Sequence, residues 1–500
     1  MLQQFLQLEP RLDELLTWQD LAQKEPPFSA WVICLKEESL YFPLDWQNHL
    51  PPYLLPNGLA VCQDLVLGTI FGKLGNLEKA TAYLGASHPL LKDFQALQAL
   101  QHEWLLQEEW LSGDAERAEE AFEAYRIAHN QAIAAHYGSW ASPPELLALH
   151  ARYQEALALA PTPDYQAFTL WQYAGLLTDI GDAPEAQAQL EKMLRQRLSL
   201  PAEHSLKSLL ATLLMQEIRV PYDWSLITQA KHLVWETMQY FESTGQTGEW
   251  ALRLIDASEI ANLHESYSES LSYINKAIQM LREEELPELL GQAQERKGTL
   301  LYTWAQSGQP QFYRGALQAW QEALKIFKKE TEPARYAQIQ HYLGVIFAEM
   351  PDEAQKKQLW ATQSIRAFQE ALLFFNEADY PYEYAQICNN FANALSKFPA
   401  ALRADHYAQA IALYEKALAV RTNAWPYERA ITLLNYLEAH WFQTQDEARL
   451  GLPQMQALWQ TMQGMAEEVL RLVDDAVLKK EAEAHLRNLE ELKIILWKDK

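Results

Sequence analysis

The sequence predicts an all-α protein built from stacked helix pairs, and three observations lead to this prediction. One stretch of the chain repeats itself after 48 residues, and prolines recur at nearly the same spacing. Glycine is scarce, with 18 in 500 residues, which disfavours a chain of tight β-hairpins. Internal repeats of this length are typical of architectures in which each unit buries its apolar face against its neighbours.

The repeat is clearest between residues 320–347 and 368–395. Ten of the 28 aligned positions are identical at a shift of 48, where chance gives about one or two. The prolines of successive units step by 46 (333 − 287), 48 (381 − 333) and 45 (426 − 381) residues. Because proline ends one helix and suits the first turn of the next, each unit reads as helix, turn, helix.

The N-terminal half carries a shorter pattern, in which Gly is followed by Asn or Asp and then by Ala five residues after the Gly. The instances are Gly75–Asn76 with Ala80, Gly113–Asp114 with Ala118, and Gly181–Asp182 with Ala186. Two antiparallel helices approach closely only where side chains are small. We therefore expect contacts at a separation of 12 residues, between Gly68 and Ala80 and between Ala174 and Ala186.

These residues resemble the tetratricopeptide repeat, whose 34-residue unit has a small residue in helix A, Ala in helix B and Pro near its end. The resemblance implies a right-handed α-solenoid of tetratricopeptide-like helix pairs. The later units are enlarged to about 45 residues, because Gly298 precedes Ala323 by 25 (323 − 298) and Gly344 precedes Ala371 by 27 (371 − 344). The extra residues belong either to the connection or to lengthened helices. Such units look like repeats found beside caspase-like (CHAT) proteases in bacterial proteins.

The chain divides by pattern into four parts. Residues 1–56 form an N-terminal cap or docking segment, 57–260 hold repeats of near-standard length, 261–450 hold the enlarged repeats, and 451–500 form capping helices. In the first part, residues 30–35 and 39–42 predict a short β-hairpin, with an irregular cap as the alternative.

Composition limits the partners. The net charge of −25 disfavours nucleic acid, whose phosphates are bound by Lys and Arg. Three scattered cysteines without a CxxC pair, and an N-terminus without a signal-peptide pattern, predict a reducing cytoplasm. No apolar stretch reaches the length of a membrane span.

No catalytic, cofactor or metal constellation stands out, so we expect no enzyme activity, no cofactor and no metal. HExxH, GxSxG and GxxxxGK[ST] are absent. His129 and His136 are expected to be surface or core histidines rather than ligands, and Cys388 a small buried filler rather than a nucleophile.

A polar row on the first helices is the candidate site for a protein or peptide partner. Some members of the tetratricopeptide family use helix-A asparagines for peptide backbones, and others clamp a carboxylate with lysines; no Lys stands at the matching places here. The candidates are Gln292, Glu295, Tyr302, Gln338, His341, Gln386, Asn389 and Asn393. Amides donate and accept at once, which suits an extended backbone. The alternative is that these side chains merely face solvent.

The leading functional hypothesis is a non-catalytic interaction scaffold or adaptor. A peptide-sensing regulator is the second hypothesis, and a regulatory partner of a caspase-like protease in bacterial defence is the third. The protease would lie on another chain, since no alternating strand–helix segment of adequate length is present.

Overall fold

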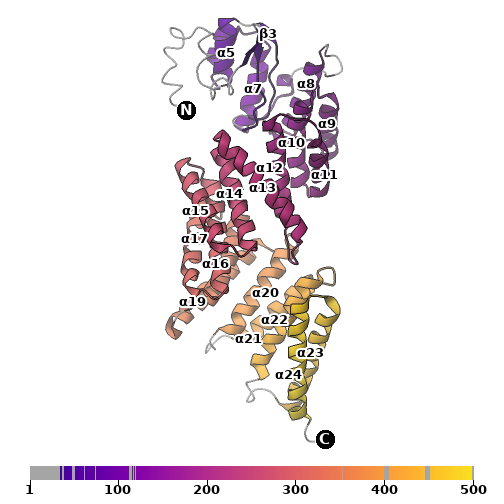
Figure 1. The fold of residues 1–500 in the computed structure, drawn as a ribbon, viewed down its shortest axis with the longest axis vertical. Coiled ribbons are helices and arrows are strands. Elements are labelled where there is room, and N and C mark those ends of the chain that lie inside the picture. The colour runs from indigo at the N-terminus through magenta and orange to yellow at the C-terminus, as the bar shows by residue number, and fades with distance from the viewer. Residues whose placement is uncertain are drawn as a thin grey trace. The chain divides into compact units, whose positions relative to one another are not determined.

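The computed structural model describes residues 34–36, 39–47, 51–60, 62–73, 75–111, 115, 118, 120–351, 353–398, 405–444 and 451–497. The chain forms two compact units, residues 1–246 and 247–500, which we describe one at a time. Both units are built mainly from antiparallel helix pairs (Figure 1). The predicted fold class, an all-α solenoid of tetratricopeptide-like helix pairs, is confirmed.

Unit 1 combines a small sheet with nine α-helices among its described residues. The strands are β1 (Cys34–Lys36), β2 (Ser39–Tyr41) and β3 (Leu59–Ala60). The helices are α5 (Gln63–Lys73), α6 (Leu77–Leu84), α7 (Leu90–Gln101), α8 (Ala121–Tyr137), α9 (Leu146–Leu159), α10 (Pro163–Asp179), α11 (Ala183–Met193), α12 (Leu200–Glu217) and α13 (Trp224–Thr244), with a 3-10 turn at Glu108–Trp110.

In the described part of unit 2, all regular secondary structure is helical. Its helices are α14 (Thr247–Leu263), α15 (Tyr267–Glu283), α16 (Pro287–Gln306), α17 (Tyr313–Ile326), α18 (Pro333–Glu349), α19 (Ala354–Phe374), α20 (Pro381–Lys397), α21 (His406–Val420), α22 (Pro426–Thr444), α23 (Leu452–Leu472) and α24 (Ala476–Leu496), with a 3-10 turn at Pro310–Phe312. The prolines of the sequence repeat start α16, α18, α20 and α22, where their missing N–H costs no helical hydrogen bond.

The expected hairpin is present near the N-terminus. Strands β1 and β2 pair antiparallel, with Cys34 opposite Tyr41, and β3 adds to β2 with Leu59 opposite Leu40. Residues 30–33 of the expected first strand lie outside the described residues.

A small residue lies eleven residues after the start of nearly every first helix of a pair, as in α16 (298 − 287) and α18 (344 − 333). We call it the central small residue. It is Ala132 in α8, Ala174 in α10, Ala211 in α12, Ser258 in α14, Gly298 in α16, Gly344 in α18 and Ala392 in α20. All of them are buried. In α22 the same place holds Leu437, which is also buried.

The central small residue makes room for a large side chain of the second helix. A Cβ added to Gly298 would overlap the indole of Trp320, and one added to Gly344 would lie 2.9 Å from ring atoms of Phe368. Both rings are buried, and the Trp320 indole N–H donates to the Glu295 carbonyl at 3.2 Å. In α5 the atoms nearest to Gly68 belong to Leu84, while Ala80 is fully buried.

Serine serves the same purpose in unit 2 where glycine or alanine is missing. Ser258 and Ser270 are 12 residues apart (270 − 258), and the Ser270 hydroxyl donates to the Ser258 carbonyl at 2.6 Å. The Ser364 hydroxyl likewise donates to the Gly344 carbonyl at 2.6 Å. Each of these hydroxyls donates its hydrogen bond to a backbone carbonyl of the facing helix. The helices therefore lie close together without leaving a buried hydroxyl unpaired.

The extra residues of the enlarged units lie in both of the expected places. Between α16 and α17 they lengthen the first helix and add the 3-10 turn. In the next pair they extend α19 at its N-terminus, so that Ser364 is the eleventh residue of α19 (364 − 353), whereas Ser270 is the fourth of α15 (270 − 266).

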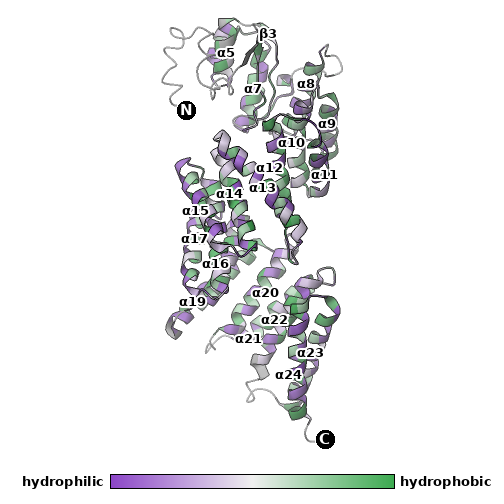
Figure 2. Cartoon of the chain, in the orientation of Figure 1, coloured by the Kyte–Doolittle hydropathy of each residue, from purple (hydrophilic) through white to green (hydrophobic). Residues whose placement is uncertain are grey.

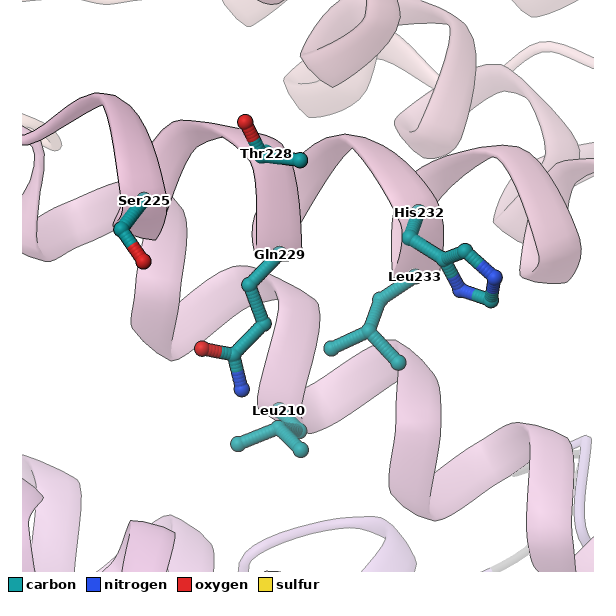
Figure 3. A pocket seen from close by; sticks show the side chains of 6 residues that line it. All are labelled: Leu210, Ser225, Thr228, Gln229, His232 and Leu233. Carbon is teal, nitrogen blue, oxygen red and sulfur yellow. The ribbon is translucent and has the colours of Figure 1, made fainter.

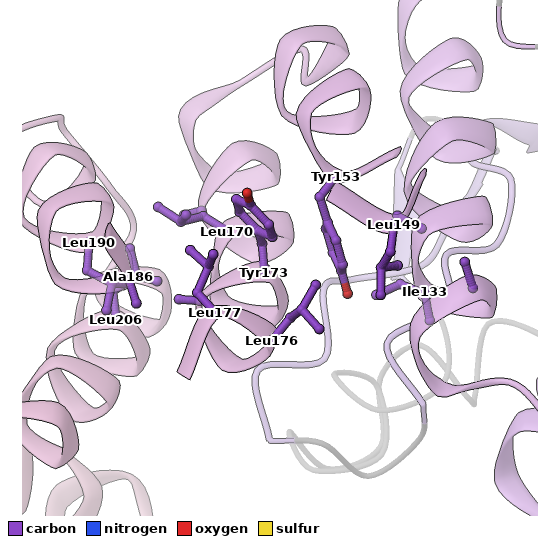
Figure 4. Close-up of a cluster of buried hydrophobic side chains, with 14 of the residues drawn as sticks. Ile133, Leu149, Tyr153, Leu170, Tyr173, Leu176, Leu177, Ala186, Leu190 and Leu206 are labelled. Carbon is purple, nitrogen blue, oxygen red and sulfur yellow. The ribbon is translucent and has the colours of Figure 1, made fainter. Parts of the chain in front are cut away.

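The core runs between the helix pairs as interdigitated apolar side chains. In unit 1 one cluster includes Ile133, Tyr153, Tyr173, Leu190 and Leu206, contributed by five different helices that point their apolar sides toward one another (Figure 4). Along the ribbons, hydrophobic and hydrophilic residues alternate, as expected for helices that each bury one side (Figure 2).

Among the described residues, no helix is long and apolar enough to cross a membrane.

The central glycine contact predicts opposite effects for two glycine substitutions in unit 2. Gly298→Ala overlaps Trp320 and should destabilise unit 2 by about 1–3 kcal/mol. Gly464→Ala, inside α23 with nothing within 4 Å of the added Cβ, should stabilise by about 0.5–1 kcal/mol. Calorimetric melting of the full chain measures both changes. Equal effects of the two substitutions would contradict the packing role of Gly298.

Candidate partner-binding surface

The central small residue lies at a constant distance from the start of nearly every first helix. Positions counted back from it are therefore equivalent from one first helix to the next. Positions 6, 3 and 2 residues before the central small residue lie on one helix face, since residues three and four apart are neighbours on a helix. In α20 these positions hold Gln386, Asn389 and Asn390, and in α18 the first two hold Gln338 and His341. We call them the register positions.

Four polar side chains from three successive first helices form a continuous hydrogen-bonded chain, which we call the amide ladder. Its members are His341 (α18), Asn389 and Asn390 (α20), and Asn435 (α22). The Asn390 amide nitrogen lies 2.9 Å from His341 Nε2. Asn389 donates to Asn390 Oδ1 at 3.1 Å, and Asn435 donates to Asn389 Oδ1 at 3.2 Å.

Buried and half-buried members alternate along the ladder, in the order His341, Asn390, Asn389, Asn435. His341 is 3% exposed and Asn389 is 4% exposed, whereas Asn390 and Asn435 are half-buried. The predicted residues His341 and Asn389 therefore contact other side chains rather than solvent. Their binding role stays a prediction, and the half-buried Asn390 and Asn435 present the ladder to the surface.

The remaining predicted residues of α18 and α20 flank the ladder. Asn393 is half-buried and accepts a hydrogen bond from the Tyr414 hydroxyl at 2.5 Å. Gln338 is half-buried beside Tyr342, with which it shares a hydrogen bond. Gln386 is half-buried at the register position one turn before Asn390. These residues leave a partly accessible polar face on two neighbouring helices.

The predicted residues of α16 form a separate, charged section. Glu295 pairs with Arg335 of α18 at 3.4 Å. Burial raises the pKa of Glu295, against the opposing effect of the Arg335 guanidinium. The Tyr302 hydroxyl donates to Glu349 at 2.8 Å, and burial followed by the Glu349 carboxylate raises the pKa of Tyr302. Gln292 is half-buried on the same helix.

His341 is the titratable member of the ladder, and its pKa is shifted. Burial lowers its pKa to about 4, so the imidazole is neutral near pH 7. Its Nδ1 is buried and has no hydrogen-bond partner among the described residues. A buried polar atom of this kind costs free energy unless it is paired.

In unit 1 the register positions of α8 bind a stretch of main chain. The positions relative to Ala132 hold Arg126, His129 and Asn130. Asn130 accepts from the Leu54 N–H at 2.7 Å and donates to the Leu54 carbonyl at 2.8 Å. His129 Nε2 lies 2.7 Å from the Pro52 carbonyl oxygen, and Arg126 donates to the Leu54 carbonyl at 3.4 Å. These three side chains thus hold an irregular segment by its backbone.

Sequence reasoning missed Asn390, Asn435 and all three of these α8 residues as site residues. The signal that could have found them is the eleven-residue spacing from helix start to central small residue, because Ala132 of α8 obeys it without a preceding proline. His129 was expected to be a surface or core histidine and is a fully buried core residue.

The described residues lend little support to two other kinds of reactive site, a metal site and a cysteine nucleophile. Among the described residues no group of three His, Cys, Asp or Glu side chains could hold a metal ion. Cys388 is fully buried, as expected, and burial raises the pKa of its thiol to about 11, which disfavours the nucleophilic thiolate.

An open depression of about 580 Å³ lies on α12 and α13. Its lining is Leu210, Ser225, Thr228, Gln229, His232 and Leu233 (Figure 3). The one titratable side chain in this lining, His232, is largely exposed. We assign no reaction to this depression.

Comparison with known proteins supplies no family for the chain. No protein-family model matches the sequence, and no curated protein matches it. Solved structures of low sequence identity do match. Yeast Tom70 is 13% identical over 86% of this chain and 82% of its own, with a TM-score of 0.35. The TPR domain of P58(IPK) is 14% identical over 86% of this chain and 98% of its own, with a TM-score of 0.23. A circular tandem repeat protein is 12% identical, covering 86% of this chain and 94% of its own, with a TM-score of 0.18. All three TM-scores lie below 0.5, so the fold assignment depends on the helix register of this chain.

The burial of His341 predicts a pH dependence of unit 2. Between pH 6.5 and about 4 the unfolded chain binds a proton at this residue that the folded chain does not, so stability falls as the pH is lowered through this window. The contribution at pH 4.5 is about 2–3 kcal/mol. His341→Asn should flatten the pH dependence of the unit 2 melting transition by this amount while leaving the range above pH 7 parallel to the wild type. Identical pH profiles would show that His341 is not held neutral.

Proposed function

We propose that the chain is a non-catalytic scaffold or adaptor that binds a protein partner through the first-helix face of unit 2. The binding residues are the half-buried members of α18 and α20 and their neighbours: Gln338, Gln386, Asn390, Asn393 and Asn435. The charged section of α16, with Gln292, Glu295 and Tyr302, extends this face. The net charge of −25 favours a protein over nucleic acid as the partner.

The observation that carries this proposal is the binding of main chain by α8. There the register positions hold Leu54 through both its N–H and its carbonyl. Asn390 occupies in α20 the position that Asn130 occupies in α8, two residues before the central small residue. The Asn390 amide already bonds His341 and accepts from Asn389, and its second amide hydrogen and second oxygen lone pair are the groups that can bind a partner's extended backbone.

The energetics favour an extended interface over a single strong contact. A neutral hydrogen bond contributes about 0.5–1.5 kcal/mol net, because each replaces a bond to water. One amide pair is therefore insufficient, and several first helices must contribute. A face that spans α16, α18 and α20 supplies such a series.

A second candidate function is a peptide-sensing regulator. The buried Nδ1 of His341 and the amide–amide bonds of the ladder can be rearranged by a peptide that supplies better partners. In that case the partner is a short peptide, and the response is a change in the packing between α18, α20 and α22. The enlarged units also suggest a narrower version of the scaffold, a cytoplasmic partner of a bacterial caspase-like protease.

A matched pair of asparagine substitutions tests the proposed face. Asn390→Ala removes an amide of the ladder, whereas Asn275→Ala removes an exposed amide from the second helix α15. We expect the first substitution to weaken the protein partner captured from native cells by about tenfold or more, equivalent to about 1.4 kcal/mol. The second should leave the captured amount unchanged.

The measurement is affinity capture with quantitative mass spectrometry, followed by titration of the purified partner. Circular dichroism and melting of both variants exclude unfolding as the cause of any loss. Retention of the partner by a folded Asn390→Ala variant would contradict binding at this face. Turnover abolished by one substitution would instead identify an enzyme.

A further inference from the structure

The α8 register positions and the segment that they hold have the organisation of a receptor and its ligand within one chain. We call residues 51–57 the strap. Among the described residues, the polar contacts of its backbone to α8 come from side chains: Asn130 to both polar groups of Leu54, His129 to Pro52, and Arg126 to Leu54. By contrast, the neighbouring β2 and β3 pair backbone to backbone.

The strap also fills apolar sites on the helices. Tyr53, Leu54 and Leu55 are 7%, 8% and 4% exposed. Tyr53 packs into the main core cluster of unit 1, and its hydroxyl donates to Asp93 of α7 at 3.1 Å. Leu54 packs in a second cluster with Tyr125 and Phe168. The strap therefore has the sequence aromatic–Leu–Leu between Pro52 and Pro56. The helices bind this sequence both through its backbone and through the apolar sites that its side chains fill.

Two of the three receptor side chains, Arg126 and His129, also have partners that do not involve the strap. Arg126 donates to Glu123 at 2.7 and 2.8 Å and to Asp93 at 3.0 Å, so the buried charges remain paired without Tyr53. His129 Nδ1 lies 2.9 Å from the Thr169 hydroxyl. These contacts orient Arg126 and His129 without the strap, so two of the three side chains of the α8 face are preorganised for an extended segment.

We propose that the strap is a displaceable intramolecular ligand of the α8 face, and that an extended aromatic–Leu–Leu segment of a partner, flanked by prolines, competes with it for Arg126, His129 and Asn130. This inference concerns unit 1; it shares with the proposed function the observed binding of main chain by α8, and it is tested separately from the unit 2 face. A tethered ligand has an effective concentration of the order of millimolar. The strap therefore keeps the α8 face closed until a partner's segment binds more tightly or the strap is weakened.

The test weakens the strap without changing the receptor. Leu54→Pro removes the N–H that Asn130 accepts, and Tyr53→Ala removes the contact to Asp93 and the apolar ring; all α8 residues stay in place. The probe is the synthetic peptide Pro-Pro-Tyr-Leu-Leu-Pro-Asn, capped at both ends and fluorescently labelled. Its binding to the full chain is measured by fluorescence anisotropy.

We expect the peptide to bind Leu54→Pro or Tyr53→Ala at least tenfold more tightly than the wild-type chain. Adding Asn130→Ala to either strap variant should reduce the affinity by tenfold or more. Adding Asn390→Ala should leave it unchanged, which separates this inference from the proposed function of unit 2. Hydrogen exchange of the wild type should also show the Leu54 amide opening at least tenfold faster than core amides of α10.

Three results would overturn the proposal. Folded strap variants could bind the peptide no better than the wild type, or binding could persist in the Asn130→Ala background. Loss of the helical melting transition of unit 1 in both strap variants would show that the strap is a permanent part of the core.

Discussion

The close approach of paired helices at the central small residue is the contact on which the rest of the structure depends. Gly298 and Gly344 admit the rings of Trp320 and Phe368 onto the helix backbone, and at Ser258 a hydrogen bond from the Ser270 hydroxyl to the Ser258 carbonyl takes the place of this arrangement. Each contact fixes how far one helix slides and rotates against the other. Since it lies eleven residues from the helix start in α8, α10, α12, α14, α16, α18 and α20, the same faces of these helices recur in register. The polar register positions are a consequence of this packing.

The register positions show two solutions to the problem of burying polar side chains. In α8 they are satisfied by the backbone of the strap, and in α18, α20 and α22 by one another through the amide ladder. A buried polar group costs about 1–3 kcal/mol when it is unpaired, so both arrangements need complete sets of partners. The amide ladder is incomplete at His341 Nδ1 among the described residues. This difference is the physical reason for assigning the open binding face to unit 2 and a closed one to unit 1.

Much of the fold could be predicted from the sequence, because the repeat at 48 residues and the prolines report local chain geometry directly. The sequence places Gly298 and Gly344 at the central position, as the structure does; at Gly68 the nearest atoms belong to Leu84, and Ala80 is fully buried. The candidate site was predicted less well. Asn130 reaches Leu54, 76 residues away, and Asn435 reaches Asn389, 46 residues away. Periodicity within one helix places Asn390 and the α8 residues at equivalent positions, but it carries no information on which distant segments they contact.

The most direct test of the central claim is site-specific photo-cross-linking on the two helices of one pair. A photoreactive amino acid at Gln386 probes the register face of α20, and one at Glu415 probes the exposed side of α21. The account predicts that the protein partner cross-links to position 386 and not to position 415. Cross-linking from position 415 alone would contradict it, because the partner would then bind the second helices rather than the face that the helix register builds.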